Sequence, residues 1–558
     1  MEKVLYSLEN DCRSCYKCIR HCPVKSISFK DGQASIIADE CILCGNCYLV
    51  CPQGCKKIRD DTDTAYELIK RGNCYASVAP SYLSAFPSTS FKKLREALIK
   101  LGFADAEETA LGATQVKREY DRLVDSSSSD VIISTCCHAV NLLIERHHPS
   151  LAKFLAPVLS PMQAHAKMIK EAHPGCTVVF LGPCIAKKDE VDRYDGYDDL
   201  DLTFIELKRM LKEKGIEVGQ DDDITLAKSK ARLFPTEGGI LATMDRLSKK
   251  YDYLAVSGMD EVLSAIEDIE KGKIHHAFVE MSSCRGSCLN GPALGGRPSL
   301  ASLLRTRHSA GKEDFDVDAP DPETLRKDFH PGPERTRRHS EEEITRVLNA
   351  IGKYSPKDEL NCSSCGYATC REKAIAVLDG KASLEMCLPY LSEKASSFGN
   401  DIIENTPNGI IVCSDDLTVQ LINPSLCQLL GVSSSACVGR SVEEILDPSL
   451  FALCLSGESI RNRHIHLEKY DLYVEASLIH DERYHIIIGT IRDRTQTHLE
   501  HEKQVRDAKA TAEITKDVIE KNLRAVQEIA QLLGESAANT KIALTNLAKT
   551  IDPDNGKR

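Results

Sequence analysis

The sequence predicts a multidomain protein that combines α/β and α+β folds, and three observations lead to this prediction. Its 558 residues are enough for about three to five domains. Cysteine-rich stretches open the chain and return after residue 340. Between them, apolar segments alternate with amphipathic ones, as strands and helices do in α/β domains. A strand-rich segment and a polar helical tail follow.

The composition excludes several classes of partner. The net charge is −12 and the pI is near 5.8, so neither a nucleic acid nor an anionic membrane is an expected partner. The sequence has no apolar run of about 18 residues and no apolar segment at its start, so we expect no membrane span. The 24 cysteines occur in ligand-type spacings rather than scattered pairs. This predicts reduced thiols in the cytoplasm of an anaerobe or low-oxygen organism.

Residues 1–60 carry two four-cysteine runs of identical spacing, each followed by a proline. The runs are Cys12, Cys15, Cys18 and Cys22, then Cys41, Cys44, Cys47 and Cys51. This C-x2-C-x2-C-x3-C-P run is that of bacterial two-cluster ferredoxins, in which the fourth cysteine of each run ligates the other cluster. We expect one [4Fe–4S] cluster on Cys12, Cys15, Cys18 and Cys51, and a second on Cys41, Cys44, Cys47 and Cys22. A zinc site or a disulfide scaffold is the alternative, although zinc motifs rarely repeat three cysteines at this spacing.

Residues 61–308 form the predicted α/β domain. Residues 130–134 and 176–182 are expected strands, and a helix is expected to end near His147 and His148. Three loops, at 134–139, 182–190 and 280–292, contain five cysteines: Cys136, Cys137, Cys184, Cys284 and Cys288. Taken singly, each is ordinarily a buried structural cysteine. Together they supply four thiolates from three strand ends, as a further cluster requires.

These three loops resemble the signature loops of the H-cluster domain of [FeFe]-hydrogenases, and residues 160–163 resemble that family's S-P-M-Q stretch. The resemblance implies a [4Fe–4S] cluster on Cys137, Cys184, Cys284 and Cys288. It also implies that Cys288 bridges to a di-iron subsite carrying CO, cyanide and a dithiolate.

The same resemblance implies roles in catalysis for three further residues. Cys136 matches the proton-relay thiol, Lys187 the cation beside a cyanide ligand, and Glu190 a supporting carboxylate. An inert buried cysteine remains the alternative for Cys136, and a surface lysine the alternative for Lys187.

The chain also departs from the fast enzymes of that family. His138 stands where they have proline, and Ser282-Ser283 where they have Met-Ala. Residues 114–120 offer only Glu119 where those enzymes place two relay carboxylates. A proton path without its carriers slows turnover and leaves the cofactor site intact.

Residues 309–340 are rich in Pro, Asp, Glu and Arg, which predicts a linker or a surface wrap. In the following module, 341–402, Cys362, Cys365 and Cys370 precede a distal Cys387. The C-x2-C-G-Y-x2-C form resembles the small [4Fe–4S] domain of corrinoid and acetyl-CoA-pathway proteins, and implies another cluster. Zinc is the alternative, since four cysteines also suit tetrahedral zinc.

Residues 403–497 resemble a PAS domain, beginning at the segment 404–413 and ending with the strand segment 484–493. We predict no particular ligand for it. The cysteines at 413, 427, 437 and 454 are expected to be ordinary side chains, as are His480 and His485. The tail, 498–558, has an apolar seam at 4,3,4,3 spacing that we expect to end at Gly534, and a second short seam beyond it. It predicts a helix packed on its own domain, a homodimer, or a partner helix.

The leading functional hypothesis is a sensory [FeFe]-hydrogenase with low turnover. H2 or the redox state would set the H-cluster state, and the PAS domain would pass it to a separate output protein, because the sequence shows no output module. The resemblance suggests a PP2C-type phosphatase as recipient and ferredoxin as redox partner. The alternatives are a catalytic ferredoxin-linked hydrogenase and a non-catalytic iron–sulfur relative without the di-iron subsite.

Overall fold

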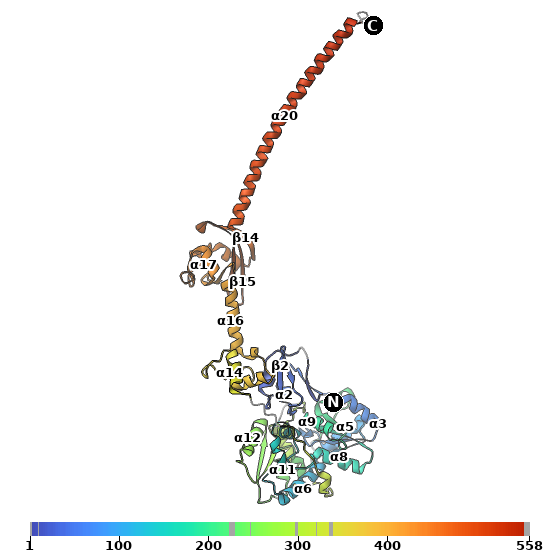
Figure 1. Ribbon diagram of the computed structural model, residues 1–558. Coiled ribbons are helices and arrows are strands. Elements are labelled where there is room, and N and C mark those ends of the chain that lie inside the picture. The colour runs from blue at the N-terminus through green and yellow to red at the C-terminus, as the bar shows by residue number, and fades with distance from the viewer. Residues whose placement is uncertain are drawn as a thin grey trace. The chain divides into compact units, whose positions relative to one another are not determined.

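The computed structural model describes residues 3–8, 11–221, 229–245, 247–295, 300–319, 321–333 and 339–551 (Figure 1). The chain divides into two compact units, Met1–Leu391 and Ser392–Arg558. Each unit is described by itself.

The first unit begins with a small module of short elements. Strand β1 (Leu5–Ser7) pairs antiparallel with β4 (Lys56–Ile58), and β2 (Ile27–Lys30) with β3 (Gln33–Ile36). The short helices α1 (Lys17–Arg20) and α2 (Asn46–Val50) lie inside the two cysteine runs. Ile19, Ile27 and Ile42 are buried among the thiols, so the module's core is built around the cysteines.

Two parallel sheets form the α/β domain. One has the order β6-β5-β8-β9 and the other β10-β11-β7. The strands are β5 (Cys74–Val78), β6 (Asp105–Glu108), β7 (Val131–Ile133), β8 (Thr177–Gly182), β9 (Leu200–Thr203), β10 (Asp252–Ser257) and β11 (Ala277–Ser282). β7, β8 and β11 are almost completely buried, as expected for parallel strands covered by helices on both faces. The strands predicted at 130–134 and 176–182 are therefore confirmed as β7 and β8.

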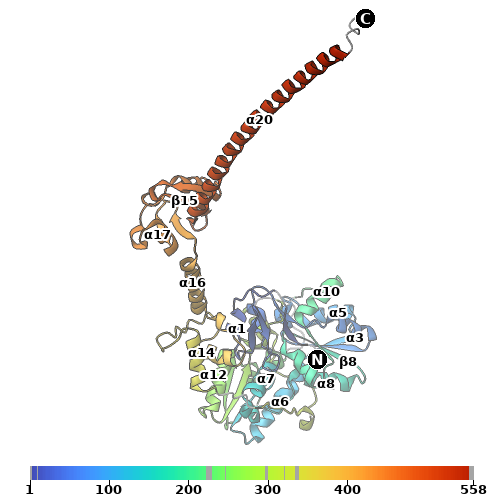
Figure 2. The same cartoon turned by 45° about the horizontal axis from the view of Figure 1, so that its top comes forward.

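Helices surround both sheets (Figure 2). They are α3 (Thr62–Arg71), α4 (Tyr82–Ala85), α5 (Phe91–Leu101), α6 (Ala110–Ser126), α7 (His138–His147), α8 (Pro161–Ala172), α9 (Ala186–Arg193), α10 (Phe204–Glu213), α11 (Gly239–Thr243), α12 (Met259–Glu270) and α13 (Leu300–Ser309). Helix α8 begins with a capping box between Ser160 and Gln163, with Pro161 in its first turn. The S-P-M-Q stretch is thus a helix start.

The segment after α13 packs against the α/β domain. Leu325 and Lys327 are 1% and 2% exposed. Leu159 N donates to Leu325 O at 2.8 Å, and Lys327 N donates to Pro157 O at 3.2 Å. We call residues 321–333 the strap. Of the two forms predicted from composition, this part of the chain takes that of a wrap.

A small helical module completes the first unit. Helices α14 (Glu341–Ala350) and α15 (Cys370–Leu378) pack together, and α16 (Leu388–Asn405) begins directly after Cys387. Phe29 N donates to Lys381 O at 2.8 Å, so this module lies against the N-terminal module.

The second unit contains a five-stranded antiparallel sheet in the order β13-β12-β16-β15-β14. The strands are β12 (Gly409–Ser414), β13 (Val419–Ile422), β14 (Ile460–Leu467), β15 (Leu472–Asp481) and β16 (Ile486–Asp493), with helices α17 (Pro424–Leu430), α18 (Ser434–Cys437) and α19 (Ser449–Leu455). Cys413, Cys437 and Cys454 are buried in its apolar core. His480 and His485 both hydrogen-bond to Asp415 at 2.9 Å.

Helix α20 (Thr495–Ile551) is a single helix of 57 residues, drawn in red in Figure 1. It continues through Gly534, so the expected break there is wrong. A glycine inside a helix costs only about 1 kcal/mol relative to alanine. A single glycine is therefore not enough to break so long a helix. Leu523, Leu533, Leu544 and Leu547 are all exposed. In the described part of the chain, no helix is long and apolar enough to cross a membrane.

Candidate metal centre

A cavity of about 110 Å³ lies in the α/β domain, where strands of both sheets end. The loops that follow β5, β7, β8 and β11 line it. In α/β proteins, ligands bind outside the carboxyl ends of parallel strands, where the loops converge. The cavity therefore lies where this fold places a ligand.

All five cysteines of the three predicted loops line this cavity: Cys136, Cys137, Cys184, Cys284 and Cys288. Gly286 and Ser287 both have left-handed backbone, which turns the chain between the last two thiols. Ser283 N donates to Cys137 Sγ at 3.5 Å, so the loops after β7 and β11 are directly linked.

The donor set suits an iron–sulfur cluster. Burial, followed by the Cys137 and Cys288 thiols, raises the pKa of Cys184, and burial raises the pKa of Cys288 to about 11. Such thiols ionise only when a cation takes the place of the proton, and soft thiolates select iron–sulfur clusters or zinc. Within the described ranges, no group of three or more His, Cys, Asp or Glu side chains is arranged to hold a single metal ion.

Cys136 has a phenol as its hydrogen-bond partner. Its Sγ lies 3.3 Å from the hydroxyl of Tyr120 on α6, and Thr135 N donates to that hydroxyl at 3.0 Å. Burial raises the pKa of Cys136 to about 12, and burial together with Cys136 raises the pKa of Tyr120 well above its usual value. Glu119, the expected carboxylate, pairs with Arg122 instead.

Lys187 reaches the cavity from the first turn of α9, and Glu190 supports it. The Lys187 ammonium donates to Cys136 O at 3.2 Å and pairs with Glu190. Glu190 also pairs with Lys327 of the strap, which donates to Gln163 Oε1 at 2.9 Å. Burial would raise the pKa of Glu190, but the two ammonium groups lower it well below its usual range.

Glu280 of β11 is a second buried carboxyl near these thiols. It accepts a hydrogen bond from Leu241 N at 3.1 Å. Burial raises its pKa to about 7, and its charge acts on both Cys136 and Cys288. The sequence places Glu280 in the third loop motif but gives no sign of this environment.

The residues that depart from the fast enzymes are also placed. His138 is buried, lines the cavity, and binds Asp189 Oδ2 through Nε2 at 2.8 Å. Ser283 donates to the sulfur of Met259 at 3.2 Å. Polar side chains thus replace apolar ones on one wall of the cavity.

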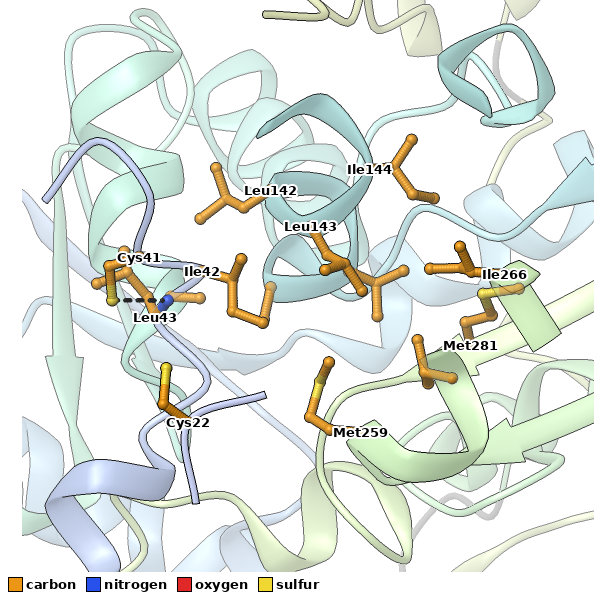
Figure 3. Packing of buried hydrophobic residues seen from close by; sticks show 14 of the residues in the cluster. Cys22, Cys41, Ile42, Leu43, Leu142, Leu143, Ile144, Met259, Ile266 and Met281 are labelled. Carbon is orange, nitrogen blue, oxygen red and sulfur yellow. Dashed lines mark hydrogen bonds between the residues drawn. The ribbon is translucent and has the colours of Figure 1, made fainter. Parts of the chain in front are cut away.

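One set of thiols from the N-terminal module lies beside the cavity. Burial raises the pKa of Cys47, and the Cys41, Cys22 and Cys18 thiols add to this, so residues of both runs are close together. Leu43 N donates to Cys41 Sγ at 3.4 Å (Figure 3). Cys44 itself lines the cavity and acts on the pKa of Cys284. The Cys22 thiol acts on Cys41, Cys44 and Cys47, so it lies near the second run; that it ligates the second cluster stays a prediction.

The other set is held less deeply. Cys12 and Cys15 both act on the pKa of Cys18, which burial raises, and Cys51 lies 3.3 Å from the sulfur of Cys55. Burial raises the pKa of Cys55, and the charges of Cys51 and Cys12 raise it further. Cys12 therefore lies near the Cys51–Cys55 pair. The sequence motif does not predict Cys55, which adds a fifth thiol.

The last set belongs to the module after the strap. Burial lowers the pKa of Lys373, while the Cys387, Cys365 and Cys370 thiols raise it, so these three lie around one ammonium group. Cys362 is exposed. Gly366 has a φ of 92°, which allows the turn between the thiols.

Four parts of the chain match known domain families. Residues 72–292 match the model for the iron-only hydrogenase large subunit, C-terminal domain. Residues 5–52 match a 4Fe-4S dicluster domain, 358–389 an Fe-S cluster domain, and 397–494 the PAS fold. The protein is therefore a multidomain iron–sulfur protein of mixed α/β type. More particularly, it joins a hydrogenase-like large-subunit domain and [4Fe–4S] domains to a PAS domain.

Parts of the chain are similar to solved structures. The [FeFe]-hydrogenase HydA1 from Chlamydomonas reinhardtii is 18% identical over 48% of this chain and 92% of that chain, with a TM-score of 0.37. The PAS domain of the HTR-like protein from Haloarcula marismortui is 26% identical over 18% of this chain and 93% of its own, with a TM-score of 0.16. A sensory box histidine kinase/response regulator domain from Geobacter sulfurreducens is 20% identical over 18% and 96%, with a TM-score of 0.16. No curated protein matches the chain.

Proposed function

We propose that this protein is a hydrogen or redox sensor with an [FeFe]-hydrogenase-type active site of low turnover. The observation that carries this proposal is the partner of Cys136: the thiol that would relay protons meets Tyr120 instead of a carboxylate. The PAS match in the same chain supports a sensory role.

The thiols divide into four candidate [4Fe–4S] sets. Cys12, Cys15, Cys18 and Cys51 would hold the first cluster; Cys22, Cys41, Cys44 and Cys47 the second; Cys137, Cys184, Cys284 and Cys288 the third; and Cys362, Cys365, Cys370 and Cys387 the fourth. Cys288 would also bridge to a di-iron subsite in the cavity. When bound, that subsite supplies reversible H2 cleavage and formation.

Proton delivery at Cys136 would limit the rate of turnover. A group relays protons well when its pKa lies near the working pH. Burial raises the pKa of Cys136 to about 12 and that of its partner Tyr120 above the usual tyrosine value. In the described residues no carboxylate hydrogen-bonds to Cys136, so a proton leaving it has no acceptor of matched pKa in contact.

The cations at the cavity wall favour retention of the cofactor. Lys187 and Lys327 both pair with the carboxylate of Glu190. The three side chains together therefore carry one more positive charge than negative charge. In a medium of low dielectric constant, such an excess attracts anionic ligands such as cyanide strongly. Lys187 lines the cavity and is the residue that would contact one.

Output would pass through the second unit. A ferredoxin would exchange electrons with the clusters, and a separate protein such as a PP2C-type phosphatase would receive the signal. The exposed apolar seam of α20 would join two copies of the chain as a coiled coil, because it keeps the 4,3 spacing on both sides of Gly534.

A second candidate function is catalysis, and Glu280 favours it. A buried carboxyl with a pKa of about 7 exchanges protons readily at neutral pH, and it acts on Cys136 and Cys288. A hydrogenase using Glu280 would turn over quickly with a reduced dye, whereas the sensor would not.

Infrared spectroscopy tests the proposal. The anaerobically reconstituted chain would be matured with a synthetic di-iron precursor and measured under argon and then H2. Sharp CO and cyanide bands that shift under H2, with slow dye-linked turnover, are expected. A full complement of iron and sulfide without such bands would mean a relative that lacks the di-iron subsite.

Two cysteine variants locate the subsite. Cys288→Ala should remove the infrared bands and leave the signals of the other clusters. Cys74→Ala is the matched control, because Cys74 is fully buried on β5 and lies outside the cavity lining. Bands that persist in Cys288→Ala would refute the bridging role.

A further inference from the structure

The module at 358–389 is fixed to the N-terminal module along one continuous junction. Arg20 donates to Ser363 O at 3.3 Å and to Ser364 O at 3.1 Å. Lys25 Nζ donates to Gly366 O at 3.0 Å. Further along, Lys381 pairs with Glu40 at 2.7 Å. Contacts through side chains and backbone hold the two candidate cluster sites in one geometry.

The backbones approach closely at Gly366. A Cβ placed there would lie 3.0 Å from Ile19 Cγ2 and 3.1 Å from Arg20 N, which is too tight for a side chain without movement. This approach brings the next residue, Tyr367, into the core formed by the N-terminal module.

Tyr367 has a buried hydroxyl that is unsatisfied. The residue is 2% exposed, and its hydroxyl has no hydrogen-bond partner among the residues that the structure describes. Lys25 Nζ lies 5.9 Å from the centre of its ring. Buried tyrosine hydroxyls usually find a partner, and leaving one unpaired costs about 1–3 kcal/mol. Such an orphaned donor points to a group that the polypeptide alone does not provide.

The thiols around Tyr367 come from both modules. Burial raises the pKa of Tyr367, and the next contributions are the thiols of Cys365 and then Cys22. Cys365 belongs to the candidate set at 362–387, and Cys22 crosses into the set with Cys41, Cys44 and Cys47. Tyr367 also packs in the same core cluster as Cys22 and Cys365, so it lies beside thiols of both candidate sets.

We propose that the Tyr367 hydroxyl donates a hydrogen bond to a sulfur atom of an iron–sulfur cluster at this junction, and that electrons cross between the two modules here. The inference rests on the proposed ligand sets at 12–51 and 362–387. The acceptor is a cluster sulfur in either case, on the Cys22 side or the Cys365 side. The transfer moves one electron from a reduced cluster to an oxidised one, and no bond forms or breaks.

A hydrogen bond to a cluster sulfur stabilises the reduced, more negative state and so raises the reduction potential. Tyr367→Phe keeps the ring and its packing and removes only the donor. Because the hydroxyl has no partner to lose in the described part of the chain, the variant should fold as the parent does. The effect of Tyr367 is therefore measurable as a change in the reduction potential of the cluster to which it donates.

The experiment is a redox titration of the full, reconstituted chain, followed by electron paramagnetic resonance. In Tyr367→Phe, one cluster should be reduced about tenfold less at a fixed potential, which corresponds to about 59 mV for a one-electron couple. The control is Tyr82→Phe: Tyr82 is 3% exposed, and the charged groups that act on its pKa are Glu108 and Arg232, not cysteines. It should leave every potential unchanged.

A third variant assigns the acceptor. The signal lost in Cys387→Ser belongs to the module at 358–389, so a shift of that signal places the acceptor on the Cys365 side and any other shift on the Cys22 side. Unchanged potentials in Tyr367→Phe at full iron content would overturn the inference. If the iron content and spectra of Cys387→Ser were the same as those of the parent protein, both the inference and the fourth ligand set would be overturned. The infrared test of the α/β site is independent of both outcomes.

Discussion

Glu190 is the carboxylate with which two buried ammonium groups both pair, so its removal should have a larger effect than the removal of either neighbour. Glu190 is fully buried, and its two oxygens bind Lys187 and Lys327 separately. In Glu190→Gln, two buried ammonium groups remain close together and both lose the carboxylate with which they pair. In Lys327→Met, a balanced Lys187–Glu190 pair remains.

The magnitudes follow from this difference. Leaving a buried charge without its partner costs about 3–5 kcal/mol, which is the expectation for Glu190→Gln. Lys327→Met loses hydrogen bonds to Glu190 and Gln163 but strands no charge, so about 1.5–3 kcal/mol is expected. The double variant keeps only Lys187, which retains its hydrogen bond to Cys136 O. Its destabilisation should fall short of the sum of the two single effects by about 1–3 kcal/mol.

Hydrogen exchange of α9 measures this cycle, because Lys187 and Glu190 both lie on that helix. Local opening free energies are read from exchange rates, and a 3 kcal/mol loss speeds exchange by more than about 100-fold. Helix α5, which contributes none of these three residues, is the internal control. Additive effects in the double variant, or a larger effect of Lys327→Met than of Glu190→Gln, would refute the view of Glu190 as the shared anion.

Three further outcomes are expected. Burial raises the pKa of Glu280 from 4.5 to about 7, so the native state binds the Glu280 proton more tightly than the unfolded state does. This contributes about 3 kcal/mol to the free energy of unfolding below pH 4.5, and the contribution is lost as the pH rises through 7. Glu280→Gln should reduce the fall in melting temperature between pH 5.5 and 8, and an unchanged slope would contradict the assignment. Gly45→Ala should slow electron transfer from the N-terminal module to the cavity, because Gly45 has a φ of 78° and a Cβ there would lie 2.6 Å from Pro292 Cβ. Gly54→Ala is the control, because Gly54 has a similar φ of 62° but open space around it. Equal electron-transfer rates in the two variants would refute the role of the Gly45–Pro292 contact. Leu523→Glu should lower the apparent mass in light scattering if α20 joins two copies, and a parent that is already monomeric would exclude that dimer.

The sequence was sufficient to predict the folds and the gathering of the thiols. Parallel strands that end at one edge of a sheet bring their loops together, so Cys137 after β7 and Cys284 after β11 meet. Cys184 follows β8 in the other sheet, and its place in the same cavity depends on how the two sheets pack. The alternating segments of the PAS region likewise determine its antiparallel sheet.

Contacts between distant segments were not predictable in the same way. Lys327 lies in a stretch whose Pro and acidic residues predict exposure, yet it is buried beside Glu190. The neighbouring apolar residues Leu325 and Phe329 were the available signal. Tyr120 could be placed on a helix, but its contact with Cys136 depends on how α6 packs against the loop after β7. Spacing within a motif carries no information on such packing.

Cys387 connects metal binding to the mechanics of the chain. It directly precedes α16, and its carbonyl accepts a hydrogen bond from Leu391 N at 2.9 Å in the first turn of that helix. α16 has no buried residues, so its start depends on this anchor. A ligand bond to Cys387 would therefore also clamp the root of the helix that continues into the PAS region. In a chain without iron, Cys387 would have no ligand bond, and the start of α16 would be held less firmly. The rigidity of the connection to the PAS region would then depend on whether the cluster is bound.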